Sequence, residues 1–205
     1  MSELSELYRD ALGELFNIGV GRAAHSLSQM VRNEIELSAP FVDLIRPDEV
    51  AVTLMGSEFQ ELSLVSIDFA GPFASKAMLL FPERNALAIL SNMLDPELTP
   101  EEVAEFEQEA MCEIGNIILN ACMSTLADEF QIELHGGLPE HFFCDTDSLA
   151  QFAADSADHL VLLLQIQLNM RQQFVQGHLL FLLSFSSLQA LSACLERYLD
   201  RFGMA

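Results

Sequence analysis

Two Glu–Asn pairs are the residues of this chain best suited to chemistry. Glu14 and Asn17 lie three residues apart, and Glu113 and Asn116 repeat the pair 99 positions later (116 − 17 = 99). Asn cannot act as a base, because its amide does not titrate near neutral pH, but its acceptor and donors can orient a water molecule. A nearby carboxylate can hold a cation on a partner. Such a pair suits phosphoryl transfer, where the electrophile is already activated and positioning supplies much of the rate.

Each pair belongs to a polar stripe on a predicted helix. In both halves the stripe residues are spaced i, i+4, i+7 and i+11, which puts each set on one helical face. The first stripe is Asp10, Glu14, Asn17 and Gly21, and the second stripe is Glu109, Glu113, Asn116 and Asn120. The apolar residues lie elsewhere on each helix, so we expect both stripes to face solvent.

A proline follows each pair at the same distance. Pro40 comes 23 residues after Asn17 (40 − 17 = 23), and Pro139 comes 23 residues after Asn116 (139 − 116 = 23). One Glu-x-x-Asn alone is a weak signal, and a solvated helix face is its ordinary explanation. Two copies with matching prolines indicate an internal repeat with a shared role.

The elements that carry the stripes occur in the same order twice. The first half predicts a helix at about 3–32, strand-like runs at 35–45, 51–55, 62–70 and 76–81, and a helix at 83–94. The second half predicts a helix at 100–130, strand-like runs at 131–143, 159–168 and 174–185, and a helix at 187–202. The first half has one strand-like run more than the second, and we interpret the order that both halves share as helix, three strands, helix. We therefore predict an α+β fold that forms one domain over 1–205, made of repeats 1–96 and 97–205. The two repeats are related by a pseudo-two-fold axis and share a single antiparallel sheet, which helices cover.

The composition is that of a globular protein with a strongly acidic surface. Hydrophobic residues make up 51% of the chain, and 31 acidic residues against 9 basic ones give a net charge of −22. Nucleic acids and anionic membranes would be repelled, so we expect neither as a partner. Solubility and a partner with a basic contact face explain this charge equally well.

We expect a cytoplasmic protein that binds no metal of its own. The N-terminus is acidic where a secretory signal would be basic and apolar, and no apolar run reaches the roughly 18 residues of a membrane span. The cysteines show no CxxC pair and no His at zinc spacing, which favours reduced thiols. No glycine loop follows a strand to cradle a phosphate, so metal and phosphate would have to come with the partner.

At these residues the sequence resembles the CheC family of chemotaxis phosphatases, which includes CheX and the phosphatase module of FliY. The family pattern is Asp or Ser, three residues, Glu, two residues, Asn, and a Pro roughly 22 residues on. The first half matches at Asp10, Glu14, Asn17 and Pro40, which lie before, within and after ELFNIGVGRAAHSLSQM. The second half matches at Glu113, Asn116 and Pro139, around EIGNIILNACMSTLADEF, with Glu109 in place of Asp or Ser.

The resemblance implies hydrolysis of the aspartyl phosphate on a response-regulator receiver domain, typically CheY. It implies that Asn17 and Asn116 align the attacking water, that Glu14 and Glu113 pair with the receiver's active-site lysine, and that the receiver binds the Mg²⁺. CheD is a further partner known in the family. The oligomeric state stays open.

Supporting roles follow from the same resemblance. Pro40 and Pro139 would shape the strand beside each helix, and Asp10 would contact the edge of the interface. Glu109 is one methylene longer than Asp, which suggests a weaker or altered second site. The alternative function is a non-catalytic adaptor that docks receivers or CheD through the same acidic faces. A third hypothesis, a structural part of the flagellar switch, would need a switch domain that these residues do not show.

Overall fold

A seven-stranded antiparallel sheet lies at the centre of the computed structural model, in the order β1-β6-β7-β3-β2-β4, with β5 also paired to β2. The structure describes residues 5–31, 34–54, 61–93, 99–145, 148–149, 151, 156, 158–170 and 173–203. The helices are α1 (Glu6–Val31), α2 (Pro47–Leu54), α3 (Glu83–Met93), α4 (Pro100–Phe130) and α6 (Phe185–Asp200). The strands are β1 (Ile35–Ile45), β2 (Glu61–Ala70), β3 (Ser75–Pro82), β4 (His135–Gly136), β5 (Glu140–Asp145), β6 (His159–Met170) and β7 (Gln173–Ser184).

The strand pairing confirms the predicted sheet shared between the two halves. At the centre, β3 of the first half pairs with β7 of the second. Towards one edge β1 pairs with β6, and towards the other β4 and β5 pair with β2. Followed inward, one edge gives β1, β6 and β7, and the other gives β4 with β5, then β2 and β3, which are the equivalent strands of the two halves. The division into repeats 1–96 and 97–205 stays a prediction, because its boundary lies outside the described residues.

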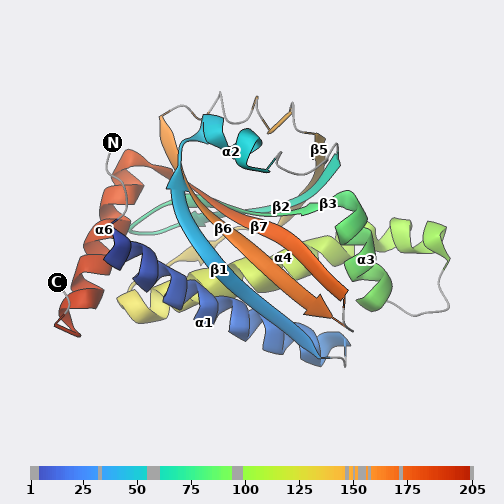
Figure 1. Ribbon diagram of the computed structural model, residues 1–205, viewed down its shortest axis with the longest axis horizontal. Helices are drawn as coiled ribbons and strands as arrows, with labels where there is room; N and C mark the ends of the chain where they lie inside the picture. Colours follow the sequence, from blue (N-terminus) through green and yellow to red (C-terminus); the bar gives the residue numbers. More distant parts are fainter. Residues whose placement is uncertain are drawn as a thin grey trace.

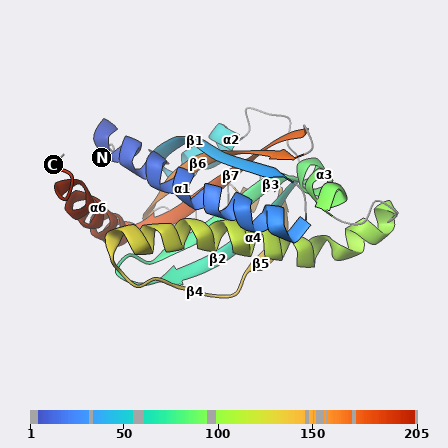
Figure 2. The ribbon, with the colours of Figure 1, turned by 90° about the horizontal axis from the view of Figure 1, so that it is seen from below.

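Both faces of the sheet are covered. Figures 1 and 2 show α1 and α4 side by side across one face, with α2 on the opposite face. Strand β3 serves both sides, since Leu79 and Phe81 join the core under α1 and α4 while Met78 and Leu80 join the cluster under α2. Burial on both faces explains why the inner strands read as nearly continuous apolar runs rather than as alternating ones.

The predicted strand at 51–55 is wrong, because its described residues belong to helix α2. Pro47 occupies the first helical position, and Asp48 and Glu49 follow in the first turn, all of which favour a helix start. The Glu49 carboxylate accepts a hydrogen bond from the Arg46 backbone N–H at 2.8 Å, as in a capping box. Val50 and Leu54, four residues apart, are buried against the sheet, so helical spacing decides the local structure.

The predicted strand at 131–143 is broken into β4 and β5. Gly136, Gly137 and Pro139 lie at the break, and these residue types weaken or interrupt a strand. The Gly137 N–H donates to the Asp68 carbonyl at 2.8 Å, and the chain then rejoins β2 at Glu140. The other predicted helices and strands are confirmed with small shifts at their ends.

Helix α4 is the longest apolar element. Among the described residues, its stretch Phe106–Phe130 alone is long and apolar enough to cross a membrane by length and composition. Half of the apolar window in that stretch is buried inside the fold. A core helix meets the same criterion, and α4 packs as one, with Ile114, Ile118 and Leu126 buried.

We expect His178 to make the fold less stable below pH 6.5. Burial on β7 lowers the pKa of His178 from 6.5 to about 4, because the charged ring is disfavoured away from water. The unfolded chain gains this proton as the pH falls through 6.5, whereas the folded chain gains it only near pH 4, so the free energy of unfolding falls across that window. The loss should reach at most about 3 kcal/mol. Urea unfolding at pH 7 and pH 4.5 should show a smaller loss for His178→Gln than for wild type, and equal losses would contradict this assignment.

Candidate functional site

The first stripe lies on the exposed side of α1. Phe16 fixes the opposite side, because its side chain is fully buried and its ring lies 5.1 Å from that of Phe181 on β7, centroid to centroid. All four members of the first stripe are exposed. The prediction that this stripe faces solvent is therefore confirmed.

The Asn17 amide is bound to a single residue of β1. Its Oδ1 accepts from the Ala39 backbone N–H at 2.9 Å, and its Nδ2 donates to the Ala39 carbonyl at 3.3 Å. Two contacts on one residue fix the orientation of the carboxamide. One N–H and one lone pair of Oδ1 remain for a water molecule.

Ala39 is available because β1 is irregular at this point. The register of β1 against β6 runs from Ser38 to Phe41 and skips the two residues between them. Pro40, the second of these, has no backbone N–H to give to a neighbouring strand. A bulge of this kind often re-aims a group beside a functional site. The proline of the motif thus directly follows the residue that holds Asn17.

Two further contacts fasten α1 along β1. Arg9 forms an ion pair with Asp43, N to O, at 3.1 Å near one end of the helix. Near the other end the Ser28 hydroxyl accepts from the Ile35 backbone N–H at 2.9 Å. The ion pair is partly exposed and contributes little stability by itself. Together with Asn17, these contacts place the first stripe relative to the edge of the sheet.

The second stripe is held differently. Glu109 and Glu113 are exposed, whereas Asn116 and Asn120 are half-buried. Asn120 Nδ2 donates to Asn116 Oδ1 at 2.7 Å and to the Asn116 carbonyl at 2.9 Å. The prediction of a solvent-facing stripe is thus confirmed for the glutamates and only partly for the asparagines.

The segment after β4 does not take the place of Ala39. Leu138 is its equivalent (39 + 99 = 138), and its side chain is 86% exposed. Within the described part of the chain, Asn116 forms no hydrogen bond with residues 137–139. Pro139 faces α4 instead, with its carbonyl 4.0 Å from Cys112 Sγ, a weak contact. Burial raises the pKa of the Cys112 thiol, which therefore stays neutral beside this stripe.

Helices α1 and α4 bring both stripes to the same side of the sheet (Figure 2). Arg22 of α1 links the helices, because its guanidinium donates to Thr125 Oγ1 at 3.2 Å and to Asp128 Oδ2 at 2.9 Å. Each Glu–Asn pair stays on its own helix. The arrangement offers two separate docking faces with an oriented amide on each.

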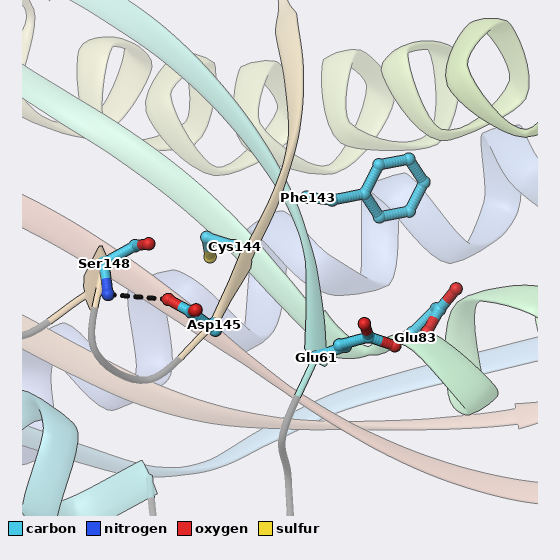
Figure 3. Close-up of a pocket in the computed structure, with 6 residues that line it drawn as sticks. All are labelled: Glu61, Glu83, Phe143, Cys144, Asp145 and Ser148. Carbon is cyan, nitrogen blue, oxygen red and sulfur yellow. Dashed lines mark hydrogen bonds between the residues drawn. The ribbon is translucent and has the colours of Figure 1, made fainter.

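A third group of carboxylates lines an open pocket of about 300 Å³ beside β5 (Figure 3). Glu61 and Glu83 lie against each other, and the pKa of Glu83 is raised by their hydrogen bond, by burial and by the charge of Glu61. Asp145 turns away and accepts from the Ser148 N–H at 2.7 Å. In the described ranges no three His, Cys, Asp or Glu side chains gather as metal ligands.

The chain is similar to known proteins in sequence and in structure. No family model matches the sequence. CheY-P phosphatase CheC of Bacillus subtilis (strain 168) is 25% identical over 166 residues, which cover 80% of this chain and 76% of CheC. Flagellar motor switch phosphatase FliY of the same organism is 23% identical over 133 residues, 63% of this chain and 34% of FliY. The crystal structure of Thermotoga maritima FliY matches with a TM-score of 0.76 at 18% identity, covering 95% of this chain and 98% of that one. The chain is thus homologous to CheC and FliY and shares the fold of FliY.

Two contacts at these stripes could not be predicted from the motif. The Ala39 backbone was missed, although Pro40 marks a position where a strand loses a hydrogen bond. The contact between Asn120 and Asn116 lies outside the motif, although a spacing of four residues on a helix allows a side-chain contact. The roles of the individual site residues stay predictions.

Proposed function

We propose that this chain is a phosphatase that hydrolyses the aspartyl phosphate of a CheY-like receiver domain in chemotaxis or two-component signalling. The observation that carries the proposal is the exposed Glu14–Asn17 pair, whose amide is already oriented by Ala39. The family relationship supports it, since CheC is a CheY-P phosphatase and FliY a flagellar motor switch phosphatase.

The role of this chain in the reaction is to position the attacking water. Asn17 or Asn116 enters the receiver site and binds the attacking water through the free N–H and lone pair of its amide. The water oxygen forms a bond to phosphorus while the bond from phosphorus to the receiver's Asp oxygen breaks. The products are inorganic phosphate and a free carboxylate. The Mg²⁺ comes with the receiver, and no residue of this chain has to transfer a phosphoryl group.

Glu14 and Glu113 are proposed to hold the receiver's lysine. Both are exposed, and neither forms an ion pair with another described residue. We expect Glu14→Gln with Glu113→Gln to weaken receiver binding about tenfold, because a charge-assisted hydrogen bond becomes an ordinary one. Titration of a receiver carrying a stable phosphate mimic measures this loss. Glu34→Gln with Glu133→Gln removes the same charge from exposed equivalent positions outside the stripes, and an equal loss there would mean that net charge alone attracts the receiver.

Phosphate release from a phosphorylated receiver tests the function. The receiver is phosphorylated with acetyl phosphate, freed of the donor, and mixed with the wild-type chain. Faster release than the receiver shows alone supports the phosphatase. Tight binding without acceleration, for each receiver encoded in the same genome, would support the adaptor instead.

A cytoplasmic location goes with this proposal, because receiver domains of two-component systems are its substrates. Binding of CheD stays a prediction, and it would use the same acidic faces. Competition between CheD and the receiver in the binding titration would show that the surfaces overlap.

A further inference from the structure

We infer that Asn120 is the positioning residue of the second site, where it takes the part that the Ala39 backbone has in the first. The inference rests on the proposed function and adds the means by which Asn116 is oriented. In each site the amide oxygen of the motif's Asn accepts one hydrogen bond from the protein. The donor is a backbone N–H in the first site, at 2.9 Å, and a side-chain amide in the second, at 2.7 Å.

The two helices differ at the position that supplies this donor. Gly21 is the equivalent of Asn120 (21 + 99 = 120), and a Cβ added at Gly21 would meet nothing within 4 Å. The first helix therefore has room for a side chain there but does not need one, because Ala39 holds Asn17. In the second site, the described residues 137–139 form no such hydrogen bond with Asn116, and the Leu138 side chain is exposed. In the second site the donor therefore comes from the helix itself.

Strand β4 passes beside Asn120. A Cβ added at Gly136 would lie 3.0 Å from Asn120 Oδ1, so the backbone of β4 passes close to the far side of this amide. Gly136 is itself held by its pairing with Phe69 of β2. Asn120 thus fits between β4 and Asn116, with its Nδ2 on two acceptors of Asn116. The edge of the sheet thus orients Asn17 directly in the first site, whereas in the second site Asn120, which lies beside β4, orients Asn116.

Loss of Asn120 should slow the second site without weakening docking. Asn116 would keep its position on α4, but its carboxamide could rotate, and fewer encounters would find the water aligned. We expect kcat of the second site to fall about five- to tenfold, the effect of losing one hydrogen bond. KM should stay unchanged, because Glu113 and the rest of the exposed face are intact. A loss of folded chain would also lower the apparent kcat, so the folded fraction of each variant is measured by urea unfolding and the loss of kcat is taken per folded chain.

The experiment uses the full chain with Asn17→Ala, so that only the second site works. Asn120→Ala and Asn120→Asp are added singly to this background; Asp has the shape of Asn but no N–H to donate. Both should lower kcat for a receiver phosphorylated with acetyl phosphate and leave KM unchanged. Ser124→Ala, one turn further along the exposed side of α4, is the matched control and should leave kcat unchanged.

Four results would overturn the inference. The first is an unchanged kcat after Asn120→Ala, and the second is an Asn120→Asp variant as active as the chain with Asn120. The third is an equal loss of kcat when Asn120→Ala is placed in an Asn116→Ala chain, in which only the first site works. The fourth is an Asn17→Ala chain that is no more active than the double variant Asn17→Ala, Asn116→Ala. Absence of acceleration by wild type would instead remove the proposed function itself. The two failures are therefore distinguishable.

Discussion

Asn17→Ala combined with Asn116→Ala should slow receiver dephosphorylation at least about 100-fold, a loss typical of removing a preorganised transition-state hydrogen bond. Affinity for the receiver should change little, because the glutamates that we propose to hold the receiver's lysine are retained. Alanine also favours the helical state, so α1 and α4 should persist. Phosphate release gives the rate, and titration with a receiver carrying a stable phosphate mimic gives the affinity. A parallel loss of affinity would contradict this division between Asn and Glu.

The double variant needs a control, because Asn17 also ties α1 to β1 through Ala39. Ser28→Ala removes another tie between the same two elements, the hydrogen bond from Ile35, at a position outside the first stripe. Its cost in the free energy of unfolding should be similar, about 1 kcal/mol. It should keep the rate of phosphate release. A rate loss in Ser28→Ala comparable with that of Asn17→Ala would show that a secure α1–β1 contact, rather than the amide, limits catalysis.

Gly19→Val should destabilise the fold by about 3 kcal/mol or more, because it overpacks the contact between α1 and α4. A Cβ at Gly19 would lie 2.8 Å from the Cα of Cys122 and 3.3 Å from the carbonyl of Ala121, both backbone atoms of α4. Backbone cannot rotate away, so the helices would have to separate. The loss is a large part of the roughly 5–15 kcal/mol that stabilises an ordinary domain.

Gly21→Val is the matched control for this prediction. It places the same side chain two residues further along α1, where an added Cβ meets nothing within 4 Å. Its helix propensity effect is the same as at Gly19, so the difference between the two variants isolates the helix contact. Urea unfolding measures both. Equal stability of the two variants would mean that α1 and α4 are not in close contact at Gly19.

Local periodicity was enough to predict most of the fold. The predicted bounds of α4 and β1 are those observed, because a long apolar stripe and a run of strand formers leave little ambiguity. The predicted strand at 51–55 was wrong because a short apolar run fits a buried strand and a buried helix equally well. The helix-start signal at Pro47 favours the helix. The break between β4 and β5 depends on where the chain meets β2, a long-range pairing that local pattern does not contain.

The exposure of the candidate residues could be predicted from the sequence, whereas their contacts could not. Helical spacing alone predicts that Glu14 and Asn17 share one exposed face, and both are exposed. The contact between Asn17 and Ala39 depends on a register shift against β6, a strand more than 100 residues away in the chain. The asymmetry expected from Glu109 also stays a prediction, whereas a second asymmetry, in how each Asn is held, emerges from the fold.

Phosphate release by the two single variants tests the central claim most directly. Asn116→Ala leaves the first site, whose amide is fixed by two contacts with β1, and should keep the larger part of the wild-type rate. Asn17→Ala leaves the second site, with its side-chain donor and Glu109, and should keep a smaller but measurable part of the wild-type rate. The double variant should keep almost none of it. A double variant that releases phosphate as fast as wild type would contradict the claim that these two amides place the attacking water.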